Sequence, residues 1–230
     1  MAIRCVLFDL FGTLVQYDAE HVSQDFTRTH RFVRSIGIDV GYDELLTEVD
    51  WVFAHLDAWS IQSHLEFSMV RVAETLFERL PTNQQVSQGH HQEFVELYIQ
   101  EWAAPVLPVP GVAALLSRCR KRFKTGIITN THYEPMVRDL LKRFKFTDFD
   151  VVMTSVDHGR PKPHANIFLA TLDQLQLEPN ECVYVGDTYR ADYVGANQVG
   201  MPCYLIGHHA RVPREYQIPS VIDLPLHLLK

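Results

Sequence analysis

The hydrophobic positions of this chain follow two different patterns, and these divide it into three stretches. The run Cys5-Val6-Leu7-Phe8 is apolar at every position, which is typical of a strand covered on both faces of a parallel sheet. Between residues 17 and 103, apolar residues recur every three or four positions, as they do in amphipathic helices. After Leu107, helical patterns alternate with short apolar runs. The chain therefore combines two kinds of structure.

The middle stretch predicts four helices that each bury one face. Gly37, Pro81 and Pro105 end three of the patterns, because glycine and proline terminate helices. We interpret the stripes as packing surfaces rather than as a cofactor site, and we expect Trp51 and Trp59 to be packed inside rather than to form a dimer contact. The residues expected on the buried faces are Val22, Phe26, Thr29, Val33 and Ile36; Leu45, Val49, Val52, Leu56 and Trp59; Phe67, Val70, Ala73, Phe77 and Leu80; and Phe94, Leu97, Tyr98 and Trp102.

The rest of the chain predicts alternating helices and strands. Strands are expected at residues 125–128, 150–154, 182–185 and 202–206, and helices at residues 112–122, 136–144, 163–175 and 189–199. Strands joined by helices pair in parallel through crossovers, so the sequence predicts an α/β protein with a parallel sheet. We expect residues 1–16 and 104–230 to form the α/β core domain and residues 17–103 to form an inserted helical domain.

Composition and charge restrict the possible partners. Hydrophobic residues make up 47% of the chain and charged residues 21%, as in ordinary globular proteins. The net charge of −7 gives no electrostatic reason to expect nucleic acid or an anionic membrane as a partner. The four cysteines lack a CxxC pair, so we expect buried free thiols in a reducing cytoplasm. The apolar runs are too short to span a bilayer, and Arg4 interrupts the first of them, so we expect no membrane segment and no signal peptide.

Polar side chains follow three of the predicted strands. Asp9 follows the first strand and Thr129-Asn130 follows the second. Asp187 follows a later strand, and Asp192 lies at the start of the next helix. In a parallel sheet all of these residues reach the same edge. Carboxylates that converge there repel one another unless a hard cation such as Mg²⁺ lies between them, and we expect Lys162 to offset the remaining negative charge.

These motifs resemble those of the haloacid dehalogenase (HAD) superfamily of hydrolases. The resemblance covers almost the whole chain, and it depends on an ordered set of motifs: Asp9-Leu10-Phe11-Gly12-Thr13, Thr129-Asn130, Lys162-Pro163, and Gly186-Asp187 with Asp192. It implies a Rossmann-like core. It also implies that the helices within residues 17–103 form a cap domain of the four-helix (C1) type that closes over the sheet edge.

The same resemblance implies a role for each motif. Asp9 becomes the nucleophile that forms a covalent aspartyl intermediate. Lys162 neutralises charge on Asp9 and the substrate, while Thr129 and the backbone of Asn130 hold the anionic group under transfer. Asp192 either binds the metal, in part through water, or orients Lys162. The implied magnesium ligands are Asp9, the backbone carbonyl of Phe11, Asp187 and Asp192, and the implied substrate contacts are Thr13, Thr129 and Asn130.

Phe11 departs from the pattern of the family phosphatases. Those enzymes usually carry a second aspartate at this position as general acid and base, which is worth about 10²–10⁴-fold in rate. The dehalogenase branch of the family accepts non-acidic residues there, because halide leaves without a proton. That branch, however, typically has Ser and Asn in place of Gly186-Asp187, and it does not use Mg²⁺. It also presents an arginine from the start of the cap, to which Arg28, Arg31 and Arg34 give no firm match.

We therefore expect Mg²⁺-dependent hydrolysis of a small, anionic, phosphorylated substrate. Aryl and acyl phosphates depend least on the acid that Phe11 replaces. One alternative is 2-haloacid dehalogenation, and another is a binding protein on a catalytically weakened HAD core. His132 follows Thr129-Asn130 closely, and as a further hypothesis it assists proton transfer. We expect no nucleic acid or membrane partner, and a monomer or a homodimer.

Overall fold

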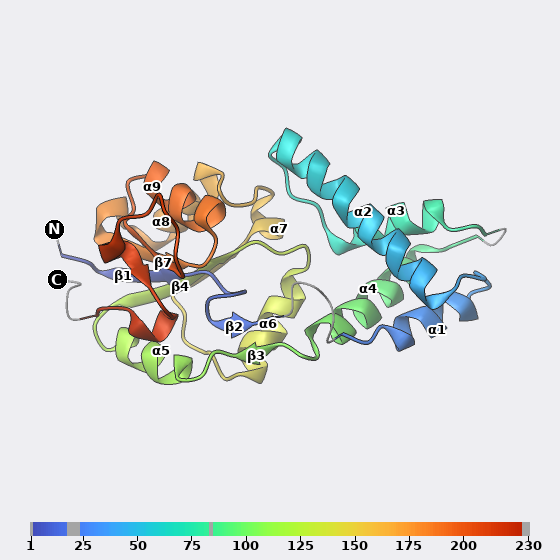
Figure 1. The fold of residues 1–230 in the computed structure, drawn as a ribbon, viewed down its shortest axis with the longest axis horizontal. Coiled ribbons are helices and arrows are strands. Elements are labelled where there is room, and N and C mark those ends of the chain that lie inside the picture. Colours follow the sequence, from blue (N-terminus) through green and yellow to red (C-terminus); the bar gives the residue numbers. More distant parts are fainter. Residues whose placement is uncertain (1, 18–23, 83–84, 227–230) are drawn as a thin grey trace. The chain divides into compact units, whose positions relative to one another are not determined.

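The computed structural model describes residues 2–17, 24–82 and 85–226. The chain divides into two compact units, one formed by Met1–Tyr17 with Leu107–Lys230 and the other by Asp18–Val106. The first unit contains a sheet with helices, and the second contains helices (Figure 1). Each unit is described by itself below.

A six-stranded sheet forms the centre of the α/β unit (Figure 1). Its order is β5-β4-β1-β6-β7-β8, and every neighbouring pair is parallel. The predicted parallel sheet is thereby confirmed. The strands are β1 (Cys5–Phe8), β4 (Lys124–Thr129), β5 (Val151–Thr154), β6 (Cys182–Gly186), β7 (Cys203–Ile206) and β8 (Gln217–Ile218). Because β1 lies between β4 and β6, its carboxyl end lies beside theirs.

Helices cover both faces of this sheet (Figure 1). One face carries α8 (Ala165–Leu175) and α9 (Gly195–Gln198), and the other carries α5 (Val112–Arg120) and α6 (Glu134–Arg143). The helix predicted at 189–199 is instead a π-helix, η2 (Tyr189–Val194), that continues into α9. The short helix α7 (Ser155–His158) and the two-residue strand β8 were not predicted, because so few residues leave no readable period.

Strand β1 is covered on both sides, as its sequence predicts. Its four side chains, from Cys5 to Phe8, are all 0% exposed. Successive side chains of a strand point to opposite faces. Cys5 and Leu7 join the apolar cluster that contains Ile167 and Phe168 of α8. The absence of polar alternation in this run therefore has a direct physical cause.

A second, two-stranded sheet pairs β2 (Val15–Gln16) with β3 (Leu107–Pro108) in antiparallel register. These two strands lie at the residues where the chain leaves the α/β unit and returns to it. The pair was not predicted, because two residues on each side give no strand pattern.

Within residues 24–82 and 85–106, the second unit contains four helices: α1 (Thr27–Ser35), α2 (Tyr42–Ser63), α3 (Met69–Arg79) and α4 (Gln88–Ala103). Helix α4 packs against α1 and α3, and α3 packs against α2. Aromatic rings fill the centre, where Phe26 stacks on Tyr98 with centroids 4.6 Å apart. The buried carboxylate of Glu101 accepts hydrogen bonds from the backbone N–H groups of Arg28 and Thr29, so that it caps the start of α1.

Three apolar residues of this unit contradict the predicted burial. Trp59 and Val70, both expected on buried stripes, are 42% and 37% exposed. Trp51 is 43% exposed, and the guanidinium of Arg79 lies 3.5 Å from the centroid of its ring. The prediction that Trp51 and Trp59 are packed inside is wrong. At the end of the α2 stripe, Ser60 takes the buried position in place of Trp59. Of the other expected stripe residues, Ile36, Leu97 and Trp102 are half-buried, and Val22 lies outside the described residues.

All four cysteines, Cys5, Cys119, Cys182 and Cys203, are buried and free, as predicted. Across residues 2–17, 24–82 and 85–226, none of the helices combines the length and apolar character needed to cross a bilayer.

Candidate active site

Asp9 is the first residue after β1 and lies at the carboxyl edge of the sheet. Its backbone N–H donates to the carbonyl of Val185 on the neighbouring strand at 2.8 Å, which fixes the chain where it leaves the sheet. The side chain is only 6% exposed. One carboxylate oxygen, Oδ1, accepts a hydrogen bond from Lys162 at 2.7 Å. Among the described residues, none donates to the other oxygen, Oδ2, at hydrogen-bond distance.

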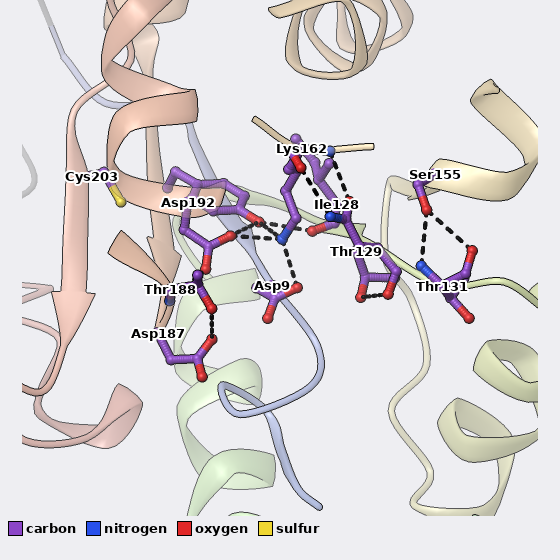
Figure 2. A network of polar contacts seen from close by, with 12 residues as sticks. Asp9, Ile128, Thr129, Thr131, Ser155, Lys162, Asp187, Thr188, Asp192 and Cys203 are labelled. Atoms are coloured by element: carbon purple, nitrogen blue, oxygen red, sulfur yellow. Dashed lines mark hydrogen bonds and ion pairs between the residues drawn. The ribbon is translucent and has the colours of Figure 1, made fainter. Parts of the chain in front are cut away.

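Lys162 lies at the centre of the site (Figure 2). Its Nζ donates to Asp9 Oδ1 and Asp192 Oδ1, each at 2.7 Å, and to the hydroxyl of Tyr184 at 2.8 Å. An ammonium group has three protons, and here each one has an acceptor. Lys162 is 5% exposed, so this charged side chain is held by hydrogen bonds rather than by water.

The side chain of Asn130 holds the backbone of Lys162. Its Oδ1 accepts from the backbone N–H of Lys162 at 2.8 Å, and its Nδ2 donates to the Lys162 carbonyl at 3.0 Å. The sequence motif had assigned only the backbone of Asn130 to substrate. The structure thus adds a structural role for the side chain, which ties the end of β4 to the loop that carries Lys162.

Both carboxylate oxygens of Asp192 accept hydrogen bonds from groups of the protein. Its Oδ1 accepts from Lys162, and its Oδ2 accepts from the backbone N–H of Thr188 at 2.8 Å. The π-helix η2 carries Asp192, and π-helical turns are frequent at functional sites. A Cβ at Gly186 would lie 2.3 Å from Cγ of Asp192, so only glycine allows this carboxylate to fold back against the strand.

Asp187 lies beside the same group but has fewer partners. Its Oδ1 accepts a long hydrogen bond of 3.4 Å from Thr188 Oγ1 (Figure 2). Its Oδ2 lies against Gly12, where a Cβ would come within 2.1 Å of it. Gly12 also has a φ of +83°, in the left-handed region that favours glycine. The loop after Asp9 is therefore shaped around the Asp187 carboxylate.

Burial and neighbouring charges together shift the pKa values of the titrating groups. Burial raises the pKa of Asp9 to about 7; Lys162 opposes this shift, and Asp192 and Asp187 add to it. Burial lowers the pKa of Lys162, but the carboxylates of Asp192 and Asp9 outweigh it and raise that pKa to about 12. Burial, followed by the charge of Asp192, also raises the pKa of Asp187. The site holds a charged lysine and disfavours ionisation of Asp9 and Asp187.

The three carboxylates meet the requirements of a divalent cation. One oxygen from each of Asp9, Asp187 and Asp192 lies within 4.8 Å of the others. With a single ammonium among them, full ionisation leaves an excess of two negative charges. A hard divalent cation balances this excess and takes oxygen ligands, as Mg²⁺ does. Asp9 and Asp187 have oxygens to offer, whereas both oxygens of Asp192 are already engaged.

The remaining predicted residues lie around the same edge. Thr129 ends β4, is fully buried, and its hydroxyl lies 3.5 Å from the Asn130 carbonyl. Thr13 is 1% exposed, and its Oγ1 is buried without a hydrogen-bond partner in the structure. An unpaired buried hydroxyl is costly and therefore suits a ligand contact. Thr131, next to Asn130, is fixed by Ser155, whose Oγ accepts from the Thr131 N–H at 2.9 Å.

His132 is half-buried, and its suggested role in proton transfer stays a prediction.

Phe11 lies next to a second aromatic residue, Tyr17. The ring centroids are 5.9 Å apart and the rings meet edge to face. Tyr17 is 41% exposed. Burial, followed by the carboxylates of Asp187 and Asp9, raises the pKa of the Tyr17 hydroxyl, so the phenol lies within electrostatic reach of the site. Phe11, at the residue where the resemblance implies an acid, is thus one member of an aromatic pair.

Two residues of this site, Tyr184 and Tyr17, were not predicted from the sequence. Tyr184 lies within an apolar run, where its ring suggests only packing. A tyrosine buried in a strand nevertheless needs a hydrogen-bond partner for its hydroxyl, and that requirement was the available signal. Tyr17 falls between the first strand and the helical stretch, where no periodic pattern applies.

Comparison with known proteins adds a family. A family model described as haloacid dehalogenase-like hydrolase matches residues 3–200. Haloacid dehalogenase-like hydrolase domain-containing protein 3 of Bos taurus is 35% identical over 50% of this chain and 49% of its own, so the chain spans about half the length of that relative. The glyceraldehyde 3-phosphate phosphatase of Pyrococcus furiosus is 29% identical over 94% of this chain and 86% of its own.

Two solved structures share the fold along nearly the whole chain. A 2-haloacid dehalogenase from Pseudomonas syringae pv. Tomato has a TM-score of 0.74 at 22% identity and covers 97% of both chains. A HAD-hydrolase from Bacillus subtilis, bound to magnesium, has a TM-score of 0.65 at 18% identity and covers 100% of this chain and 99% of its own. At these identities the likeness shows the fold and leaves the reaction open.

Proposed function

The chain belongs to the haloacid dehalogenase-like hydrolases, and we propose that it hydrolyses a small phosphorylated substrate in a Mg²⁺-dependent reaction through a covalent intermediate on Asp9. The observation that carries this proposal is the placement of Lys162 and Asp187 on either side of Asp9. When ionised, the three carboxylates carry two more charges than the single ammonium balances. A divalent cation would balance this excess when an anionic substrate binds. A phosphatase relative that aligns with 94% of the chain supports it further.

In the proposed first step, Asp9 attacks the phosphorus atom of the substrate. The new bond joins an Asp9 carboxylate oxygen to phosphorus, and the bond from phosphorus to the leaving oxygen breaks, so that the leaving group departs with the electron pair. In the second step, water attacks the phosphorus atom of the aspartyl phosphate and loses a proton to solvent, and the bond from phosphorus to the Asp9 oxygen breaks. Inorganic phosphate is released, and the free Asp9 carboxylate is restored.

The other residues stabilise charge during both steps. Lys162 neutralises Asp9 and the transferred group. The hydroxyl of Thr13, which is buried without a partner, and the Thr129–Asn130 segment donate hydrogen bonds to the phosphoryl oxygens. Asp9, Asp187 and the Phe11 carbonyl hold the Mg²⁺ ion, with Asp192 acting through water or through Lys162. The bound ion supplies positive charge that offsets the charge on the phosphoryl oxygens.

We also propose that residues 17–103 act as the cap domain and that their side chains select the substrate. The four-helix unit at Asp18–Val106 supports this assignment.

The test of the proposed function is phosphate release from a broad panel of phosphate esters and acyl phosphates. We expect release that rises with Mg²⁺, stops in EDTA and is lost in Asp9→Asn. A panel on which Mg²⁺ stimulates no release would contradict the proposal.

Phe11 restricts the leaving groups that such a reaction tolerates. Without an acid beside the leaving oxygen, substrates whose leaving groups need no proton react best, such as aryl and acyl phosphates. Phe11→Asp is expected to raise kcat/KM for alkyl phosphates by about 10²-fold or more and to change that for aryl phosphates much less. Phe11→Asn has the same shape without the acid and serves as the matched control; an equal gain in Asn would contradict the explanation.

Phe11 also favours a second candidate, the hydrolysis of a carbon–halogen bond, because halide leaves without a proton. Against it, Arg28 and Arg34 of the first cap helix already bind Gln100 and Asp39. Chloride release from 2-chloropropionate that persists in EDTA and is lost in Asp9→Asn would establish this reaction instead.

A further inference from the structure

We propose that Tyr184 is a positioning residue that holds the ammonium group of Lys162 between Asp9 and Asp192. This inference rests on the proposed function for the role of Lys162 in the reaction. Its geometric part depends only on the described contacts around the lysine.

The Tyr184 hydroxyl is a hydrogen-bond bridge. It accepts from Lys162 Nζ at 2.8 Å and donates to the backbone carbonyl of Ile128 at 2.8 Å, with Asp192 Oδ1 at 3.2 Å as a second neighbour. The Ile128 carbonyl belongs to β4, which is fixed on both sides by β1 and β5. The hydroxyl thereby connects the lysine side chain to a strand that is hydrogen-bonded on both sides.

The third bond matters because two carboxylates alone do not fix an ammonium group. Lys162 has four rotatable bonds before Nζ and reaches Asp9 and Asp192 from its own loop. With Tyr184 as the third acceptor, all three protons have fixed directions. Without it, one proton is left unpaired in a buried site, and the side chain can move to satisfy it.

The ring of Tyr184 is itself held in place. Tyr184 is 0% exposed, and its ring meets that of Phe168 edge to face with centroids 5.4 Å apart. Phe168 in turn lies against Gly195, where a Cβ would come within 2.8 Å of the ring. The hydroxyl position is therefore set by packing between α8, β6 and α9, and not by the lysine that it contacts.

The experiment compares wild type with Tyr184→Phe, which removes the hydroxyl and keeps the ring. Tyr204→Phe is the matched control, because Tyr204 is also buried and lies opposite Val185 on the next strand. For the phosphate ester that the wild type turns over best, we expect Tyr184→Phe to lower kcat about 10-fold with KM changed less than about twofold. Tyr204→Phe should leave both parameters unchanged.

A second readout follows the lysine directly. In protein labelled with ¹⁵N at lysine side chains, the buried Lys162 ammonium should give a slowly exchanging signal, whose protons show a nuclear Overhauser effect to Tyr184. In Tyr184→Phe, this signal should shift and its exchange should accelerate at least about tenfold. An unchanged signal overturns the proposal whatever happens to kcat, and so does an unchanged kcat in an active enzyme.

The two readouts separate this inference from the proposed function. If the wild type releases no phosphate from any ester, the proposed function fails, and the Lys162 signal still decides whether Tyr184 positions the lysine. If Tyr184→Phe does not fold, the wild-type Overhauser effect between Tyr184 and Lys162 decides, and its absence overturns the proposal.

Discussion

Asp187 and Asp192 lie five residues apart at the same sheet edge, yet the chain treats them in opposite ways. Asp192 is 1% exposed, and its two oxygens accept from Lys162 Nζ and the Thr188 N–H. Asp187 is only partly buried, and its Oδ1 accepts a hydrogen bond of 3.4 Å from the Thr188 hydroxyl. A carboxylate whose two oxygens both accept short hydrogen bonds from the protein stabilises the fold of the site. A carboxylate with few partners in the protein is suited to bind a ligand.

The difference shows that one short motif, Asp187 to Asp192, supplies one carboxylate for the internal structure and another for a ligand. Asp192 forms an ion pair with Lys162, whereas Asp187 remains available to the cation that the cluster is proposed to bind. The four predictions below separate the two tasks, beginning with the residue that both of them serve.

The largest effect is expected at Asp9, one of whose carboxylate oxygens lies within 4.8 Å of an oxygen of each of the other two carboxylates. Asp9→Asn removes the nucleophile while keeping its shape, so kcat should fall at least about 10³-fold. Phosphate release with the preferred ester measures the loss. The covalent intermediate should also disappear when the protein is denatured rapidly after exposure to a ³²P-labelled donor. Activity within tenfold of wild type would show that Asp9 is not the nucleophile.

Next in size is the effect of Asp192→Asn on stability. The substitution weakens charged hydrogen bonds to Lys162 and the Thr188 N–H, which are worth about 1.5–3 kcal/mol each, and we expect a loss of about that size in the free energy of unfolding. Urea denaturation without metal measures it. Added Mg²⁺ should not restore activity. A variant as stable as wild type would contradict a structural role for Asp192.

Asp187→Asn should show the opposite behaviour. With few internal bonds to lose, its free energy of unfolding without metal should stay within about 0.5 kcal/mol of wild type. Its affinity for Mg²⁺ should fall at least about tenfold, because one anionic ligand becomes neutral. Calorimetric titration with Mg²⁺ measures the affinity, and high Mg²⁺ should restore part of the activity. Unchanged Mg²⁺ affinity would remove Asp187 from the metal site.

The smallest effect is expected from Gly12→Ala, which leaves both carboxylates in the sequence. The new Cβ would lie 2.1 Å from Asp187 Oδ2, at a residue whose φ is +83°, so the Asp187 carboxylate must move. We expect about 1 kcal/mol less stability and a several-fold weaker Mg²⁺ affinity than wild type. Gly159→Ala also has a positive φ but open space around its Cβ, and it should lose stability without losing affinity.

The sequence was most informative where one physical requirement determines the residue type. The uninterrupted apolar run at Cys5–Phe8 predicted a central parallel strand, because a strand covered on both faces needs no polar position. The polar residues after the strands predicted which groups meet at the sheet edge. Their proposed roles stay predictions until the experiments above are done.

Other features depend on tertiary contacts that a local pattern does not contain. Trp59 fits the apolar period of α2, but Ser60 occupies the buried direction beside it. The strand β8 has two residues and exists because β7 offers an open edge. The Tyr184 hydroxyl contacts Lys162 and Ile128 only after three segments of the chain have come together.

The enclosure of Lys162 has a consequence for chemical labelling. Amine-selective reagents attack the neutral, accessible form of a lysine, and this side chain is charged, 3% exposed and bonded at all three protons. In the folded protein, Lys162 should therefore react far more slowly than surface lysines such as Lys121. Its labelling rate, followed by mass spectrometry, therefore reports how often this sheet edge opens transiently.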